Sequence, residues 1–204
     1  NEVYVSGCYF LNNNGDDGIN IIGGKSIIRD NVFDGNRDAV DIDLGSSLFE
    51  RNLIINSKDD GIDCGTVDEM IIQNNLILKS GDKGISVGEK SYVLVENNII
   101  KNGNVGIAVK DGSKAKFTKN IITENKVGLS VYEKYDILDS NPNISISGDS
   151  WIGYNGINYK FGLSKRDLNN SGITNLIHNS ENKNKLENEI YKNCEICKKW
   201  SVYD

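Results

Sequence analysis

A four-residue pattern, small, apolar, usually polar and then apolar, recurs along this chain at nearly constant spacing. Its copies advance by 21, 22, 23, 22 and 22 residues. A period this constant indicates a solenoid, in which each turn buries its apolar face against its neighbours. Residues one period apart then lie above one another, so the sequence maps a surface. The six copies begin at Gly18, Ala39, Gly61, Gly84, Gly106 and Gly128.

Each period also carries an asparagine followed by two apolar residues, with a short β-rich run before it. Three short strand-like pieces fill every period, and none is long enough for a helix. The sequence therefore predicts an all-β, right-handed parallel β-helix of about six turns over residues 1–135, with adjacent strands roughly 4.8 Å apart. The asparagines are expected to form a buried hydrogen-bonded ladder. They are Asn31, Asn52, Asn75, Asn98 and Asn120.

The repeat fades after Tyr135, and residues 136–204 are predicted to form irregular final turns, a cap and a short amphipathic helix of the same domain. Leu186, Ile190 and Cys194 fall four residues apart, which is typical of one helix face. The nearby Cys194-Glu195-Ile196-Cys197 has no second cysteine pair to complete a zinc site. It is read as packing or a local disulfide, with redox and metal roles as alternatives.

Composition limits the partners. A formal charge of −6 and a pI near 4.9 argue against nucleic acid, because no basic patch could neutralise phosphates. No apolar run is long enough to predict a membrane span. The chain opens on Glu2-Val3-Tyr4-Val5, which already resembles a strand. We therefore expect a longer natural protein in which any secretion signal lies upstream. The oligomeric state is left open.

Alternation along the strands predicts a charged face. Val40 and Ile42 point inward, so Asp41 and Asp43 point outward. Extending that phase gives three neighbouring columns, which place acidic and basic side chains together. The columns are Asn20, Asp41, Asp63, Ser86, Ala108 and Ser130; Asp43, Gly65, Gly88, Lys110 and Tyr132; and Asp17, Asp38, Asp60 and Lys83.

Two carboxylates one turn apart repel by roughly 3 kcal/mol at an effective dielectric near 20. Relief could come from Lys83, from bound Ca²⁺, or from a carboxyl that keeps its proton. Asp17, Asp38 and Asp60 also suit ordinary turns. Aspartate is disfavoured in mid-strand, so a functional role is the favoured interpretation of Asp41, Asp43 and Asp63. The predicted metal ligands are Asp41, Asp43, Asp60 and Asp63.

The same arrangement suits an enzyme acting on a sugar acid. Carboxylates or Ca²⁺ would polarise the uronate, while a neighbouring basic group removes the proton α to its carboxylate. His178, the one histidine, is expected in the cap, which disfavours mechanisms that need histidine. The predicted catalytic residues are Lys83, Lys110, Tyr132 and Asp63, and the predicted substrate-binding residues are Asp38, Asp41, Ser86, Glu89 and Lys134.

Over residues 3–135 these motifs resemble the right-handed β-helix superfamily, which includes pectate lyases, alginate lyases and mannuronan C5-epimerases. A closer resemblance is to a bacterial branch with turns such as Gly81-Asp82-Lys83-Gly84-Ile85-Ser86 and Gly106-Ile107-Ala108-Val109-Lys110-Asp111. The resemblance implies an extracellular or cell-surface protein, and some members of the branch carry spore-coat-kinase-like domains. The Gly-His-Gly and Arg-Ile-Lys motifs of hydrolases that cleave polygalacturonate are absent.

The leading hypothesis is a lyase or epimerase acting on an acidic polysaccharide, in preference to a glycoside hydrolase. Ca²⁺ is the one cofactor considered. The alternative is a non-catalytic carbohydrate-binding or surface module with a shallow face and aromatic platforms. A region of a larger enzyme whose chemistry lies elsewhere is a third reading.

Overall fold

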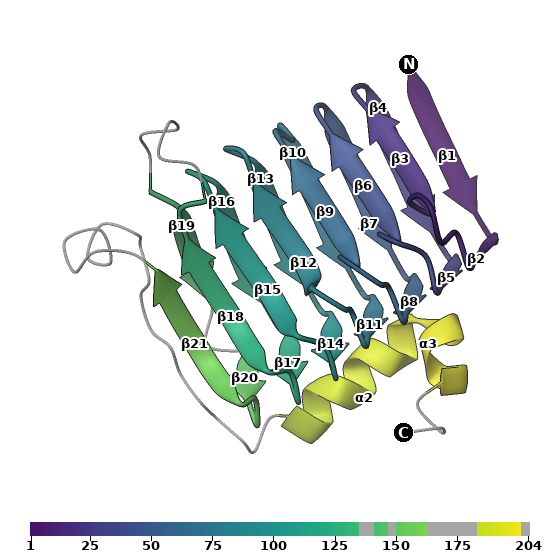
Figure 1. The fold of residues 1–204 in the computed structure, drawn as a ribbon. Helices are drawn as coiled ribbons and strands as arrows, with labels where there is room; N and C mark the ends of the chain where they lie inside the picture. The colour runs from purple at the N-terminus through teal and green to yellow at the C-terminus, as the bar shows by residue number, and fades with distance from the viewer. Residues whose placement is uncertain (135–140, 147–149, 163–182, 201–204) are drawn as a thin grey trace.

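The chain winds into a parallel β-solenoid with three sheets along its length (Figure 1). The computed structural model describes residues 1–134, 141–146, 150–162 and 183–200. Each sheet has seven strands, one from each turn, and every pairing is parallel with the strand of the next turn. This confirms the predicted all-β class and β-helix architecture.

The three sheets share one register over the whole stack. Sheet A contains β1 (Glu2–Ser6), β4 (Lys25–Arg29), β7 (Ser46–Glu50), β10 (Glu69–Gln73), β13 (Tyr92–Glu96), β16 (Lys114–Thr118) and β19 (Asn143–Ile146). Sheet B contains β2 (Tyr9–Leu11), β5 (Val32–Asp34), β8 (Leu53–Ile55), β11 (Leu76–Leu78), β14 (Ile99–Lys101), β17 (Ile121–Thr123) and β20 (Trp151–Gly153). Sheet C contains β3 (Ile19–Ile22), β6 (Val40–Asp43), β9 (Ile62–Gly65), β12 (Lys83–Gly88), β15 (Val105–Lys110), β18 (Val127–Tyr132) and β21 (Ile157–Gly162).

The repeated small residue marks a close approach between turns. A Cβ added to Gly84 would stand 2.6 Å from the carbonyl oxygen of Gly106, and one added to Gly106 would stand equally close to that of Gly128. Such contacts are shorter than real Cβ atoms tolerate, so only a very small residue fits easily. The apolar residues that follow are partly buried in the first turn and fully buried from Val40 onward, and they stack turn upon turn in one core cluster.

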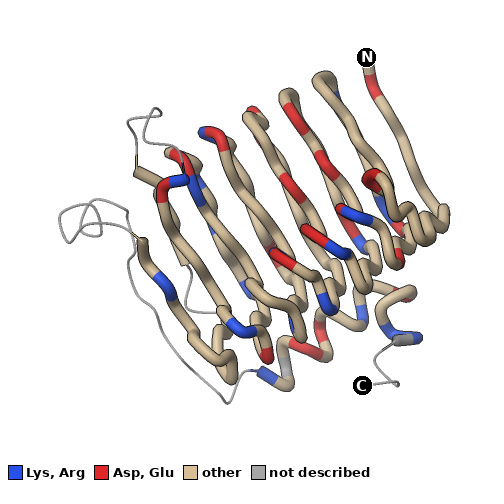
Figure 2. The backbone as a smooth tube through the Cα atoms, in the orientation of Figure 1, with Lys and Arg blue, Asp and Glu red and all other residues tan. Residues whose placement is uncertain are grey.

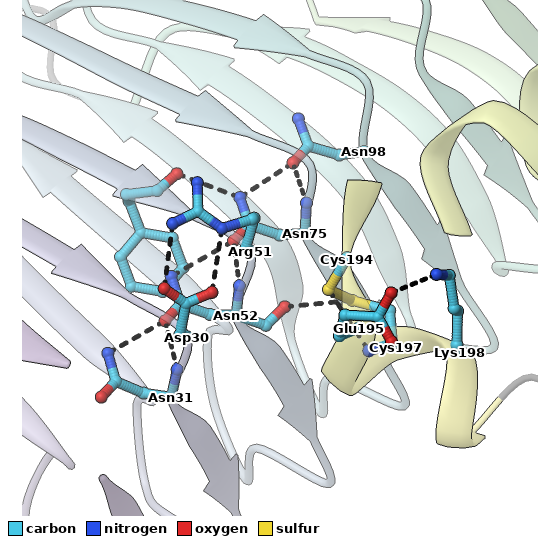
Figure 3. The surroundings of a disulfide bond; sticks show 11 residues. Asp30, Asn31, Arg51, Asn52, Asn75, Asn98, Cys194, Glu195, Cys197 and Lys198 are labelled. Atoms are coloured by element: carbon cyan, nitrogen blue, oxygen red, sulfur yellow. Dashed lines mark hydrogen bonds and ion pairs between the residues drawn. A yellow bond between two sulfur atoms is a disulfide. The ribbon is translucent and has the colours of Figure 1, made fainter. Parts of the chain in front are cut away.

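The predicted asparagine ladder is present (Figure 3). The Asn52 amide N–H donates to Oδ1 of Asn75 at 2.8 Å, and the Asn75 amide donates to Oδ1 of Asn98 at 3.0 Å. The Asn75 side-chain amide also donates to the carbonyl of Phe49. All three asparagines have no exposed surface. The column therefore satisfies buried backbone groups at one corner of each turn.

More of the solenoid continues past residue 135 than the fading pattern predicts. β19, β20 and β21 each extend one sheet, and Leu129 pairs with Tyr159 as regularly as any earlier rung. The spacing lengthens here, because Ser130 pairs with Lys160, thirty residues on. Tyr135 and His178, with most of the predicted cap, lie outside the described residues.

The predicted C-terminal helix consists of α2 (Lys183–Asn193) and the short α3 (Glu195–Trp200). It lies along the outside of sheet B (Figure 1), where Leu186 and Ile190 are buried against strand residues such as Leu76 and Ile99. Cys194 and Cys197 form a disulfide, and the Cys197 sulfur lies 3.7 Å from the carbonyl oxygen of Asn52 (Figure 3). Of the four alternatives for this pair, the structure shows the local disulfide. Neither described helix has the length and hydrophobicity needed to cross a bilayer.

Candidate functional site

The outward face of sheet C carries the charged columns in the register that the repeat predicts. Asp41 pairs with Asn20 on one side and with Asp63 on the other, and Asp63 pairs with Ser86. Charged positions accordingly recur along this sheet (Figure 2). Two kinds of surface result: an acidic one on β6, β9 and the end of β12, and a lysine-lined one on β12 to β21.

The turn column before sheet C is a second hydrogen-bonded ladder. Asp38 donates its amide N–H to Oδ1 of Asp17 at 3.3 Å, and Asp60 donates to Oδ1 of Asp38 at 2.6 Å. Asp38 and Asp60 are only 6% and 4% exposed. Burial raises the pKa of Asp38 to about 7, although its hydrogen bond with the Asp60 amide opposes the shift. The Asp38 carboxylate, predicted to bind substrate, thus caps the backbone of the next turn.

Lys83 ends this ladder and neutralises it. Its amide N–H donates to Oδ1 of Asp60 at 2.9 Å, and its ammonium lies 3.2 Å from the same oxygen and also contacts Asp82. Burial raises the pKa of Asp60 to about 6, and the positive charge of Lys83 limits that rise. Burial disfavours the Lys83 ammonium as well, but its bonds with Asp82 and Asp60 raise its pKa above the ordinary value. Lys83 is therefore held in its charged form.

Four carboxylates, Asp41, Asp43, Asp63 and Glu89, form what we call the acidic stretch. Two of them flank Gly65, where a Cβ would stand 2.1 Å from an Asp43 oxygen and 3.2 Å from a Glu89 oxygen. Glycine thus leaves the space that these two side chains occupy. Burial raises the pKa of Asp41 to about 7, and the charges of Asp43 and Asp63 add to the shift.

This shift makes stability depend on pH in a defined direction. Between the ordinary value of 3.8 and about 7, folded Asp41 holds a proton that the unfolded chain releases, so its contribution is complete at low pH and is lost as pH rises. We expect Asp41→Asn to gain stability relative to wild type between about pH 5 and about pH 8, measured by urea unfolding. The exposed Asp68→Asn should show no such trend. A stability difference for Asp41→Asn that stays constant with pH would contradict the assignment.

The predicted calcium ligands do not form one compact site. Among the described residues, the carboxylate oxygens that approach within 4.8 Å of one another belong to Asp59, Asp60 and Asp82. Only Asp60 is shared with the predicted set, and the Lys83 ammonium already contacts Asp60 and Asp82. A Ca²⁺ ion at this cluster would have to displace the Lys83 ammonium.

A pocket of about 450 Å³ opens on the later strands of sheet C, and we call it the lysine pocket. Lys83, Lys110, Lys134 and Lys160 line it from four successive turns, which concentrates positive charge in a concave site. Its wall is completed by Asp82, Val105, Ala108, Ser130, Tyr132 and Gly162. Positive charge concentrated in a concave site attracts anionic groups.

Lys110 differs from the other lysines of the pocket in its burial. It is 7% exposed, and no residue of the described chain accepts a hydrogen bond from its ammonium or forms an ion pair with it. Its Cε lies 3.1 Å from the point where a Gly88 Cβ would stand, so the side chain folds over that glycine. Tyr132, the next residue of the column, pairs with Lys110 across the sheet. Burial raises the pKa of Tyr132, so its phenol keeps its proton at neutral pH.

The structure thus divides the predicted site residues into two groups. Lys83, Lys110, Tyr132 and Lys134 line the lysine pocket. Ser86 is fully buried between the two surfaces, in register with both Asp63 and Ala108. The remaining predicted residues lie outside the pocket lining, in the acidic stretch or in the turn ladder: Asp38, Asp41, Asp43, Asp60, Asp63 and Glu89.

Sequence reasoning missed Lys160 and did not assign a role to Asp82. Lys160 was missed because the longer connection between β18 and β19 breaks the period that defines the columns. The alternation of Ile157, Tyr159 and Phe161 was the available signal, since it places Lys160 in the outward phase. Asp82 is adjacent to Lys83 in sequence, but nothing in a turn sequence indicates that Asp82 and Asp60 will both form ion pairs with the Lys83 ammonium.

Fold and site together define a parallel β-helix with a basic pocket on one sheet face. The family described as right handed beta helix region matches residues 1–150, which is most of the chain, and the protein belongs to that family. No curated protein and no solved structure matches the chain significantly.

Proposed function

We propose that this protein is an extracellular enzyme that breaks the C5–H bond of a uronate within an acidic polysaccharide, as a lyase or an epimerase. The observation that carries the proposal is the lysine pocket. It brings Lys83, Lys110 and Tyr132, all predicted to handle protons, into one cavity with two further lysines, Lys134 and Lys160. β-helix membership is compatible with such a role but does not define it.

The chemistry requires three functions from the protein. Cations must offset the uronate carboxylate so that the C5 proton becomes acidic, and a base must take that proton. In a lyase, the C5–H electron pair forms the C4=C5 double bond while the C4–O bond breaks, and the leaving oxygen receives a proton from an acid. In an epimerase, a proton instead returns to C5 from the opposite face.

We assign these functions to three side chains. Lys83, held charged by Asp60 and Asp82, is suited to bind the carboxylate and unsuited to act as a base. Lys110 is the candidate base, because it lines the pocket and has no carboxylate partner in the described chain. Tyr132 retains its phenolic proton and is the candidate acid.

The binding step is testable by thermal unfolding. Short oligomers of galacturonate, mannuronate, guluronate or glucuronate are compared with their methyl esters, which lack the negative charge. At about 100 times its Kd, a ligand stabilises the folded state by about 2.7 kcal/mol, or roughly 5–10 °C in Tm for a chain of this size. We expect one uronate series to give such a shift and its ester to give none.

Two controls decide between interpretations. Lys134→Ala with Lys160→Ala should remove the shift, since both exposed side chains line the pocket. Ca²⁺ alone should leave Tm unchanged. Equal shifts with the acid and its ester would contradict the pocket assignment, as would no shift with any uronate. The second outcome would favour the non-catalytic module.

A further inference from the structure

Among the described residues no ion pair joins the acidic stretch to a cation, although the charge of Arg37, beyond ion-pair distance, opposes the rise that burial causes in the pKa of Asp41. In the described part of the chain, Asp43, Asp63 and Glu89 take part in no ion pair, and Asp41 accepts one hydrogen bond, at 2.9 Å, from the Asn20 side-chain amide. The charges of Asp43, two residues along the same strand, and of Asp63, one turn away, also act on Asp41. Carboxylates placed so close and held in no ion pair favour a cationic ligand.

A bare metal ion is a poor match for this surface. No three carboxylates of the acidic stretch can each place one oxygen within 4.8 Å of the others. Among the described residues, the carboxylates of Asp59, Asp60 and Asp82 do so. The carboxylates are spread over successive strands, which lie roughly 4.8 Å apart. A ligand that matches them must spread its polar and positive groups over a similar length.

Lys110 gives a second, independent indication of a ligand. Its buried ammonium lies over Gly88. Gly88 pairs with Gly65 on the neighbouring strand, and the oxygens of Asp43 and Glu89 lie over Gly65. A cation and two anions thus face one another across a floor of two glycines, yet no ion pair joins them in the described chain. Such a gap suits hydroxyl groups, which donate to carboxylates and accept from an ammonium.

Ser86 marks the same junction. It is fully buried, and its hydroxyl has no hydrogen-bond partner among the described residues. It stands in the outward column between Asp63 and Ala108, where the acidic stretch meets the lysine pocket. The two surfaces are therefore continuous along one face.

We infer that sheet C binds a glycan of mixed charge, with an amino sugar bearing a free ammonium over the acidic stretch and a uronate in the lysine pocket. The uronate half rests on the proposed function, and the amino-sugar half does not. The strand spacing of about 4.8 Å is close to the rise of one sugar along an extended glycan, so neighbouring sugars would contact neighbouring strands.

The test uses short oligomers of glucosamine, which are cationic, and of N-acetylglucosamine, which are neutral and otherwise matched. Titration calorimetry should show binding of the glucosamine oligomer at least about tenfold tighter than its acetylated counterpart. The triple variant Asp41→Asn, Asp43→Asn and Asp63→Asn should lose that preference. A triple variant with the same net charge, Glu2→Gln, Asp68→Asn and Glu69→Gln, removes exposed carboxylates outside sheet C and should retain it.

Three results would overturn the inference: equal affinity for both oligomers, no binding of either, or equal loss in the two triple variants. The last would show attraction to net charge alone. Thermal unfolding of each variant verifies folding. Failure of the proposed function is distinguishable, because it would appear as absent uronate binding while glucosamine oligomers still bind.

Discussion

Replacing Lys110 by methionine should lower the rate of C5–H cleavage by about 10²–10⁴-fold, the usual contribution of a positioned general base. Lys83, Lys134 and Lys160 remain to hold the uronate, so binding should change much less than turnover. Methionine keeps the apolar stem that covers Gly88, and the fold should therefore persist. The measurement is the rate at which a uronate oligomer loses its C5 proton in D₂O, because a lyase removes that proton to form the C4=C5 double bond and an epimerase replaces it with deuterium.

Two companion variants separate a base from a simple positive charge. Lys110→Arg keeps the charge but cannot accept a proton near neutral pH, so it should be as impaired as Lys110→Met. Lys126→Met removes an exposed lysine outside the pocket lining and should behave as wild type. Recovery of activity in Lys110→Arg would show that Lys110 acts electrostatically, and undiminished loss of the C5 proton in Lys110→Met would remove it from the mechanism.

The largest loss of stability is expected at the centre of the asparagine ladder. Asn75→Ala removes the acceptor of the Asn52 amide and the donor to the Phe49 carbonyl, both in the fully buried corner. Leaving such groups without partners costs 1–3 kcal/mol each, so we expect the free energy of unfolding to fall by about 3 kcal/mol. Urea unfolding at one pH measures it.

The matched control is Asn184→Ala, an exposed asparagine of α2, which should change stability by less than about 0.5 kcal/mol. A similar change in the free energy of unfolding for the two variants would mean that the hydrogen bonds of the ladder contribute little to stability. A loss at Asn75 that is restored in Asn75→Gln would also argue against the observed bonds, since the longer side chain cannot reproduce them.

The repeat predicts the fold well because its period is a physical constraint on every turn. The small residue at Gly84 and Gly106 allows the turns to approach, and the buried asparagines satisfy the same corner each time. Both features recur once per turn, so their spacing in the sequence is sufficient to predict the fold. The register of Asp41, Asp63 and Ser86 follows from it directly.

The site is less predictable because it depends on side-chain directions and on breaks in the period. The columns place Asp43 and Lys110 on one line, but only the structure shows both folding over glycines toward each other. Alternation marks Asp60 as a surface residue, whereas its carboxylate is buried in contact with the Lys83 amide and ammonium. The longer connection between β18 and β19 shifts the period and so conceals Lys160.

Loss of the C5 proton from uronate oligomers in the presence of the wild-type protein tests the central claim most directly. Uronate oligomers of the four series are incubated in D₂O, and the C5 signal is followed by NMR together with the absorbance of unsaturated products. We predict loss of the C5 proton signal in at least one series, and its retention in the same series with Lys110→Met. Full retention of that signal in every series that binds the protein would contradict the assignment of the lysine pocket as a catalytic site.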